Sequence, residues 1–349
     1  MPMNMLITKE YRGKEDDILL KYLFIVFAIV LILVPHIIPL YFTPDFPMYH
    51  GLRLLPPNSS NMLNYEPYFL LSVFLNRVVF NSGWHTFLLF FTVPYVMISM
   101  YLIKKISISP IFSLYVFTFM FYIHFGLSGI RNGLAIAFVW WGIYDLFDDN
   151  KIGFFTKITI AFLCHYSSIV FLLFYFIKRD SLNRTIYFLL PVIGFIFGIF
   201  VFTFDFFMYL TRFLPEFLSV KVQSYLRLLI LYPMHELNQI NVINSYSLFA
   251  LAVYYAFLFM PLTEEKEILF VKIIGVGLFL FFSMRVVPTF SFRFFVGFMT
   301  FLVFLIPYLP QKFPRHSRNF IVFWLAIAVI ILSWNFYVRH KFLNFACFN

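Results

Sequence analysis

Long apolar runs separated by short polar segments recur along the whole chain. Each run has about 18–25 residues, enough to cross a hydrocarbon core of roughly 30 Å as an α-helix. The apolar positions do not alternate with polar ones, as they would in the strands of a closed barrel. The pattern therefore predicts an all-α polytopic membrane protein, a single transmembrane domain over residues 1–349 with about ten spanning elements. Spans are expected near residues 22–41, 84–103, 110–127, 132–147, 185–203, 246–262, 268–284, 292–309 and 320–337.

Two regions between these runs predict helices that do not cross the membrane. Residues 66–80 are apolar but short, and Asn76 and Arg77 interrupt them. They favour an interfacial helix lying on the membrane, within a first extracytoplasmic loop at 42–82. Residues 204–245 are the longest non-spanning region. Their interleaved aromatic and aliphatic positions predict short, ordered helices in a long extracytoplasmic loop that covers the polar groups of that side.

Residues 152–177 are ambiguous as a single span. They are apolar apart from Lys157 and the sequence His165-Tyr-Ser-Ser, and basic residues follow from position 178 to 184. One plain span would place those basic residues outside, against the preference of Lys and Arg for the cytoplasm. A segment that breaks at His165 and returns would place them inside. We therefore expect a broken helix, which membranes tolerate where it is buried in protein or lines a wet cavity.

Composition agrees with a membrane protein and excludes several functions. The chain is 62% hydrophobic and 12% charged, whereas a soluble domain is roughly half apolar and a quarter charged. The net charge of +10 is dispersed between the apolar runs, so it indicates topology and contact with lipid or phosphate, not nucleic-acid binding. Cys164 and Cys347 form no disulfide or metal pattern. No Walker loop, metal-ligand spacing or nucleophile elbow occurs, and no cofactor is expected.

One stretch carries an arginine at or near membrane depth. In His124–Ala137, Arg131 is surrounded by small residues and has no acidic neighbour in sequence, so we expect it to be unpaired. An intramembrane arginine is costly and is seldom without function. The alternative is that Arg131 marks a helix end and extends its guanidinium to the headgroups.

Under this topology, further polar groups gather on the non-cytoplasmic side. Arginine forks there would bind phosphate oxygens bidentately. A histidine can move a proton near neutral pH, and a carboxylate can act as a base or orient the histidine. The set therefore suits the binding of a diphosphate, although none of these residues forms a specific sequence motif. Its members are Asp45, Tyr49, His50, Arg53, Glu66, Arg131, His165, Arg285 and Arg293.

Several of these residues also have a purely structural interpretation. His165 fits a core histidine bonded to a backbone carbonyl, and Asp45 fits a turn residue in Pro-Asp-Phe-Pro. Glu66 fits an acidic residue at a helix start, where it meets the helix dipole. Arg53 and Arg285 fit interfacial anchors.

The residues around Arg131 and His165 resemble those of a known family. Ser-Gly-Ile-Arg131-Asn-Gly-Leu-Ala resembles the Ile-Arg-Gln-Gly-Leu-Ala signature of the EpsG/Wzy-like bacterial polysaccharide polymerases, with Asn132 in place of the usual glutamine. Ala161-Phe-Leu-Cys-His165-Tyr-Ser-Ser-Ile is similar to the family's Phe-His-x-Ser-Ala element. Asp45 with Tyr49, and Glu66-Pro-Tyr68, match the Asp-x-x-x-Tyr and Glu-x-x-Tyr-like positions. Either Arg285 or Arg293 resembles the late arginine element, so the resemblance covers about 40–300.

The resemblance implies an enzyme that polymerises lipid-linked oligosaccharide repeat units, with a GT-C-like lipid-dependent glycosyltransferase architecture. The growing glycan would leave undecaprenyl diphosphate for a hydroxyl of an incoming unit, at the outer face of the bacterial inner membrane and without metal or nucleotide sugar. The implied catalytic residues are His165, Arg131, Arg293 and Asp45. The implied substrate-binding residues are Tyr49, Arg53, Glu66, Tyr166 and Arg285. The implied partners are the undecaprenyl-diphosphate-linked oligosaccharide, the bilayer, a chain-length regulator and a flippase, and no nucleic acid.

Three other functions share parts of this pattern. A sugar-modifying membrane acyltransferase would need an acyl-donor site on the cytoplasmic side, which the sequence does not indicate. An O-antigen ligase shares the chemistry, and the Arg131–His165 spacing favours a polymerase over it. A flippase or transporter of the lipid-linked oligosaccharide should show internal repeats and a charged path across the membrane. Here the charges collect at one face.

Overall fold

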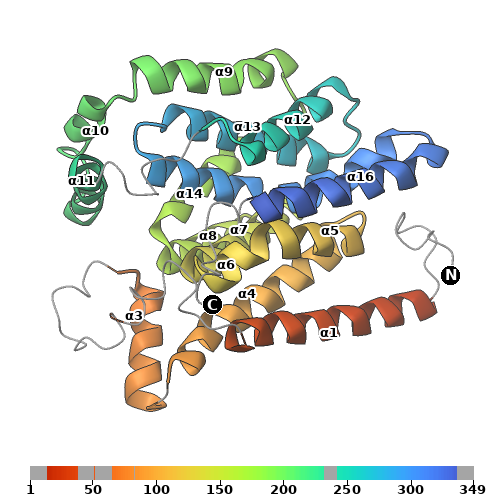
Figure 1. Ribbon diagram of the computed structural model, residues 1–349, viewed down its shortest axis with the longest axis horizontal. Helices are drawn as coiled ribbons and strands as arrows, with labels where there is room; N and C mark the ends of the chain where they lie inside the picture. Colours follow the sequence, from red (N-terminus) through yellow and green to blue (C-terminus); the bar gives the residue numbers. More distant parts are fainter. Residues whose placement is uncertain (1–13, 38–50, 52–64, 82, 232–241, 336–349) are drawn as a thin grey trace. The chain divides into compact units, whose positions relative to one another are not determined.

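The computed structural model describes residues 14–37, 51, 65–81, 83–231 and 242–335, and every regular element in these ranges is a helix (Figure 1). The chain divides into two compact units. The first unit contains residues 1–177 and 306–349, and the second contains residues 178–305. The predicted all-α class is thus confirmed for the described part of the chain.

The first unit is built from helices of the N-terminal half and the last helix. Most are α-helical, but η5 and η6 are π-helices, and η7 and η9 are 3₁₀-helices. The elements are α1 (Lys14–Ile37), α3 (Pro67–Phe74), η5 (Leu75–Val79), α4 (Trp84–Ile106), α5 (Pro110–Val116), η6 (Phe117–Tyr122), α6 (Ile123–Leu127), α7 (Ile130–Phe147), α8 (Lys151–Cys164), η7 (Tyr166–Phe176), η9 (Ile306–Lys312) and α16 (Arg315–Trp334).

The second unit holds the remaining helices. Its elements are α9 (Arg184–Phe200), α10 (Phe204–Leu210), α11 (Glu216–Leu231), α12 (Ser245–Phe259), α13 (Glu265–Ser283), α14 (Pro288–Met299) and α15 (Leu302–Leu305). The long segment 204–245 thus begins with two short helices, α10 and α11, as its aromatic and aliphatic positions predict.

Five helices in the described residues are long and apolar enough to cross a membrane. They are Ile18–Ile37, Trp84–Ile106, Pro110–Leu127, Phe290–Lys312 and Arg315–Trp334, and α9 with α10 forms a sixth candidate that is bent by 86°. The chain is therefore a multi-pass helical membrane protein by length and composition. The expected total of about ten spanning elements is not confirmed, because several predicted spans correspond to shorter or more polar helices.

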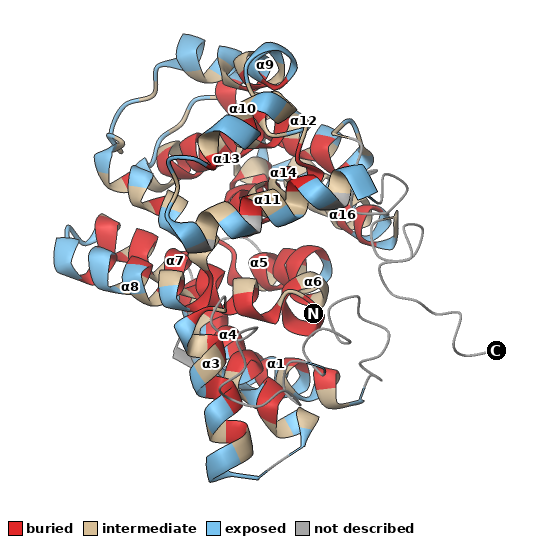
Figure 2. Ribbon diagram, turned by 90° about the vertical axis from the view of Figure 1, so that its left-hand side faces the viewer, coloured by how far each residue is buried: buried red, intermediate tan, exposed pale blue. Residues whose placement is uncertain are grey.

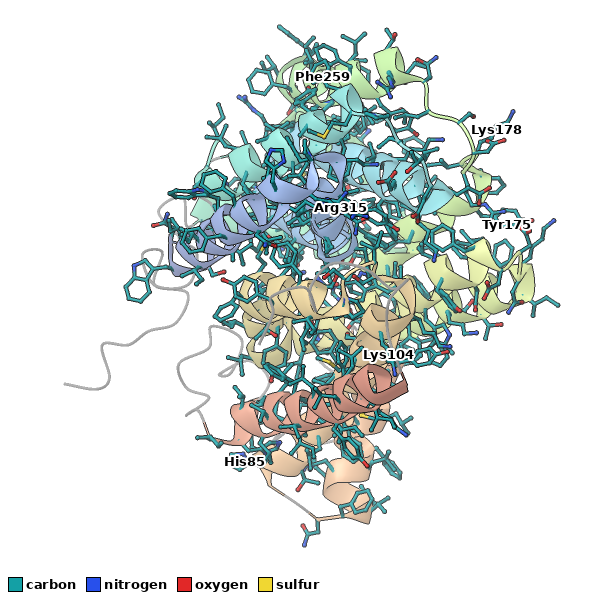
Figure 3. All side chains as sticks on the ribbon, turned by 90° about the vertical axis from the view of Figure 1, so that its right-hand side faces the viewer. His85, Lys104, Tyr175, Lys178, Phe259 and Arg315 are labelled. Carbon is teal, nitrogen blue, oxygen red and sulfur yellow. The ribbon has the colours of Figure 1, made fainter. Side chains whose placement is uncertain are left out.

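The core of the first unit lies around α4 to α7, whose residues are largely buried (Figure 2). His85 and Lys104 lie toward the two ends of α4 (Figure 3). Buried hydroxyls join helices across this core: the Tyr115 hydroxyl donates to the Ala326 carbonyl at 2.7 Å, and Ser333 Oγ donates to the Phe119 carbonyl at 2.9 Å. Such bonds satisfy polar groups that would otherwise be unpaired in an apolar medium, and they tie α16 to α5 and η6.

The segment 152–177 is broken at His165, as predicted from its charge distribution. His165 has φ −158° and ψ 117°, an extended conformation that ends α8 and precedes η7. The chain then turns back, because the rings of Phe154 and Phe155 near the start of α8 lie 6.0 and 4.8 Å from the ring of Tyr175 near the end of η7. Both ends of this hairpin therefore lie together. The cytoplasmic location expected for residues 178–184 stays a prediction.

In the second unit, α9 packs unusually close to α13. Gly194 and Gly198 lie four residues apart on one face of α9, and a Cβ on Gly194 would be 2.6 Å from the Phe279 carbonyl oxygen. Small residues at this spacing let two helix backbones approach in a membrane. The Tyr254 hydroxyl of α12 also donates to the Tyr187 carbonyl of α9 at 2.5 Å. These contacts hold α9, α12 and α13 as one group.

Candidate active site

Three of the predicted site residues meet inside the first unit. Arg131 Nη1 donates a hydrogen bond to Glu66 Oε2, and Glu66 Oε1 lies 3.1 Å from His165 Nδ1. Glu66 is only 1% exposed, and the side chains of Arg131 and His165 are each 11% exposed. The carboxylate therefore bridges the arginine and the histidine in a buried network, which we call the Arg131–Glu66–His165 network.

Each member of the network lies at the start of a helix. Glu66 is the N-cap of α3, Arg131 is the second residue of α7, and His165 is the N-cap of η7. The N-terminal end of a helix carries partial positive charge from its unpaired N–H groups. Three helix starts therefore lie around the Glu66 carboxylate, and their partial positive charge and the Arg131 guanidinium favour its ionised form.

The local sequence explains how the backbone reaches this arrangement. Glu66 precedes Pro67, which favours the extended conformation that Glu66 adopts (φ −65°, ψ 144°) and begins a helix well at its first position. Before α7, the N–H groups of Ser128 and Gly129 both bond the His124 carbonyl and end α6. A Cβ on Gly133 would lie 2.8 Å from the Phe125 carbonyl oxygen, so glycine allows α7 to pass close to α6.

The prediction that Arg131 is unpaired is wrong, and the structure does not support the alternative in which Arg131 extends to the headgroups. It is not unpaired, because Glu66, 65 residues earlier in the chain, accepts its hydrogen bond. It does not extend to the headgroups, because its side chain is mostly buried between rings: its guanidinium carbon lies 5.4 Å from the centre of the Tyr65 ring and 5.3 Å from that of Phe69. These cation–π contacts hold the guanidinium in one orientation. Tyr65 and Phe69 were not identified from the sequence, where nothing distinguishes them from many other aromatic residues.

The contact between Glu66 and His165 determines the tautomer of the histidine. An ionised carboxylate can only accept hydrogen bonds. With Glu66 ionised beside Arg131, the proton of a neutral His165 ring therefore lies on Nδ1, and Nε2 is the basic nitrogen. His165 thus bonds a carboxylate through Nδ1, which is the arrangement that positions a general base in many hydrolases and transferases.

Tyr166 lies beside this network. Its hydroxyl donates to the Tyr65 carbonyl at 3.2 Å, and Ser168 Oγ donates to the His165 carbonyl at 2.9 Å. The Tyr166 bond ties the chain break after α8 to the residue before Glu66, and the Ser168 bond stabilises the break itself. The substrate-binding role implied for Tyr166 stays a prediction.

The two late arginines have different surroundings in the second unit. Arg293 on α14 is half-buried, and its Nη1 donates to the Tyr225 hydroxyl of α11 at 2.5 Å. Its guanidinium carbon also lies 5.3 Å from the centre of the Tyr225 ring. Arg285 is exposed and lies over the Phe195 ring at 5.6 Å. Tyr225 of α11 therefore contacts Arg293, and the cover that segment 204–245 was expected to give the other polar groups stays a prediction.

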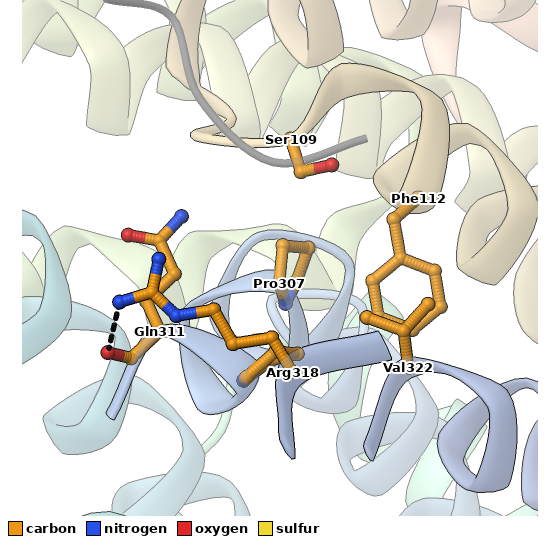
Figure 4. A pocket seen from close by; sticks show the side chains of 7 residues that line it. Ser109, Phe112, Pro307, Gln311, Arg318 and Val322 are labelled. Carbon is orange, nitrogen blue, oxygen red and sulfur yellow. Dashed lines mark hydrogen bonds between the residues drawn. The ribbon is translucent and has the colours of Figure 1, made fainter. Parts of the chain in front are cut away.

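The remaining predicted residues, Asp45, Tyr49, His50 and Arg53, lie outside the described residues, and their roles stay predictions. A small pocket in the first unit is lined by Ser109, Phe112, Arg318 and neighbours (Figure 4). Its volume of about 10 Å³ is roughly that of one water molecule. It is too small to be the site of a sugar substrate.

Comparison with known proteins gives a family but no close relative. No curated protein matches the chain, and no solved structure matches it. The model of the EpsG family matches residues 21–349, nearly the whole chain, and this match agrees with the resemblance of the Arg131 and His165 segments. The chain belongs to the EpsG family.

Proposed function

We propose that this protein is a metal-independent, lipid-dependent glycosyltransferase that polymerises oligosaccharide repeat units. The growing glycan leaves undecaprenyl diphosphate and joins a hydroxyl of an incoming lipid-linked unit, at the outer face of the bacterial inner membrane. Family membership supports a role in polysaccharide polymerisation. The observation that carries the chemistry is the buried Arg131–Glu66–His165 network at the meeting point of three helix starts.

In this proposal His165 is the general base. The acceptor hydroxyl gives its proton to Nε2 while its oxygen forms a bond to the anomeric carbon of the growing glycan. The bond from that carbon to the diphosphate oxygen breaks, and the electron pair leaves with undecaprenyl diphosphate. Glu66 holds Nδ1–H and stabilises the imidazolium that forms. The burial of Glu66 (1% exposed) favours this positioning role over direct contact with a sugar.

Arginines and helix ends stabilise the leaving diphosphate. Negative charge grows on the diphosphate as the glycosidic bond breaks, so fixed positive groups lower the barrier. Arg131 and the starts of α3, α7 and η7 supply such charge in one place. Arg293 is the second arginine of the proposal, with Arg285 as the alternative. Asp45, Tyr49, Arg53 and Tyr166 are proposed to contact the sugars, in a fold of about ten membrane segments with GT-C-like architecture.

The proposal predicts activity from the lipid-linked substrate alone. Purified protein in nanodiscs, given undecaprenyl-diphosphate-linked repeat unit with chelator and without nucleotide sugar, should produce a ladder of polymers on a gel. Arg131→Ala and His165→Asn should abolish the ladder, and the exposed Arg315→Ala serves as the matched arginine control. No ladder from folded wild-type protein, or a normal ladder from His165→Asn, would contradict the proposal. Transport of the unit across liposomes without any ladder would favour a flippase.

A further inference from the structure

A groove lies in the second unit, at α10 and α11, and most of its lining side chains carry polar groups. Its volume is about 570 Å³, within the range of roughly 300–1,000 Å³ that is typical of ligand sites. It is made entirely of residues from the second unit, whereas the Arg131–Glu66–His165 network belongs to the first. We call it the α10–α11 groove, and its lining residues are Asp205, Met208, Tyr209, Thr211, Arg212 and Gln223.

The groove forms because α10 turns away from α9 and buries only one face. The axis of α10 is bent by 86° from that of α9. Phe207 on the buried face packs with Val222, Leu226 and Val287. Tyr209, which lines the groove, is 56% exposed. An aromatic ring is therefore presented at the rim of a hollow whose other groups are mostly polar.

The polar groups of the groove are held in defined positions. The Arg212 guanidinium carbon lies 5.6 Å from the centre of the Tyr209 ring, which orients both side chains. Thr211 is 6% exposed and its hydroxyl donates to the Met208 carbonyl at 2.7 Å, which leaves the lone pairs of its oxygen able to accept a hydrogen bond. Gln223 Nε2 donates to Ser219 Oγ at 3.2 Å. The Asp205 carboxylate adds a strong acceptor.

This combination fits a sugar better than a lipid headgroup or a phosphate. A pyranose ring has an apolar C–H face that stacks on an aromatic ring, and a rim of hydroxyls that both donate and accept. Tyr209 matches the face, while Asp205, Arg212 and Gln223 match the rim. A phosphate would meet repulsion from Asp205. A purely membrane-anchoring face would not need a carboxylate and an amide beside its aromatic ring.

We propose that the α10–α11 groove is a glycan-binding site, which holds sugar rings of the lipid-linked substrate. The identity of the ligand as a repeat-unit oligosaccharide rests on the proposed function. Binding at this groove would retain the growing glycan by its sugars alone, so it requires neither the lipid nor the diphosphate.

Free oligosaccharide tests the groove directly. The probe is the repeat-unit oligosaccharide released from its lipid diphosphate by mild acid, and the measurement is saturation-transfer NMR with the full-length protein in nanodiscs. Tyr209→Ala should weaken binding about tenfold, a loss of about 1.4 kcal/mol, and Tyr209→Phe should restore it because the ring remains. Asp205→Asn should weaken binding severalfold. Tyr22→Ala on α1, a tyrosine that is 63% exposed, is the matched control and should bind as wild type does.

The outcomes separate this inference from the proposed function. Glu66→Gln should bind free oligosaccharide normally while it loses polymerisation. If wild-type protein forms no polymer but still binds the oligosaccharide through Tyr209, the groove stands and the polymerase proposal fails. The glycan-binding role of the groove would be wrong if wild-type protein transferred no saturation to the oligosaccharide. It would also be wrong if Tyr22→Ala weakened oligosaccharide binding as much as Tyr209→Ala does. Unchanged oligosaccharide binding with weaker membrane retention of Tyr209→Ala would make α10 an interfacial anchor instead, and would also overturn it.

Discussion

Glu66→Gln is the change that most directly tests the buried network. Glutamine has nearly the shape of glutamate, but it removes the negative charge that both Arg131 and His165 contact. Removing one partner of a buried ion pair typically costs about 3–5 kcal/mol, because the other charge is left uncompensated. The amide oxygen of glutamine still accepts one hydrogen bond, so we expect a loss near the lower value, about 3 kcal/mol.

The same change should reduce catalysis by a separate route. A glutamine can present either its oxygen or its amide group to His165 Nδ1, and the amide group would place the histidine proton on Nε2. The histidine could then no longer accept the proton of the acceptor hydroxyl. Loss of the carboxylate partner of a catalytic histidine reduces rates by about 10⁴-fold in a serine protease. We expect a fall of at least about 10³-fold in the initial rate of polymer formation, equivalent to roughly 4 kcal/mol.

Two assays separate the stability effect from the catalytic effect. The initial rate is measured as the appearance of polymer from lipid-linked repeat unit in nanodiscs, and stability is measured by denaturant unfolding followed through helical circular dichroism. Glu265→Gln, which removes an exposed carboxylate at the start of α13, is the matched control and should leave both unchanged. The double variant Glu66→Gln with Arg131→Met should recover stability without recovering activity, because it leaves no unpaired buried charge. Wild-type rate and stability in Glu66→Gln would refute the reasoning.

Three further predictions follow from other contacts. Tyr225→Phe removes the hydrogen bond from Arg293 but keeps the ring, so polymer formation should fall severalfold. Arg293→Ala should abolish polymer formation. If both variants form polymer as fast as wild type, Arg293 has no part in the mechanism. Gly194→Leu should lower the free energy of unfolding by about 1–3 kcal/mol, because a side chain at this position would collide with the Phe279 carbonyl. An unchanged free energy of unfolding would mean that α9 and α13 do not pack this closely. A cysteine placed within residues 178–184 should resist a membrane-impermeant thiol reagent added from outside, and labelling there would contradict the cytoplasmic location.

Features that depend on local composition were predictable from the sequence. Apolar runs identified the helices, since a membrane accepts a spanning backbone only when its hydrogen bonds are satisfied internally. The run at 110–127 is helical over the same residues, as α5, η6 and α6. The break at His165 was also predictable, because the basic residues at 178–184 favour the cytoplasmic side and a single unbroken span would place them outside. The local signature around Arg131 and His165 was enough to indicate the family.

The partners of these residues were decided by tertiary structure. Arg131 has no acidic neighbour in sequence, and its partner Glu66 is 65 residues away on a different helix. Glu66 was expected to contact sugar or to meet a helix dipole, since no local pattern indicates that its side chain is buried between two other site residues. The α10–α11 groove likewise depends on the 86° bend after α9. Hydropathy and the cost of buried charge were enough to predict which segments are helical and which polar residues are unusual. Only the packing of distant helices decided which charges neutralise one another, because that choice depends on contacts between residues far apart in the chain.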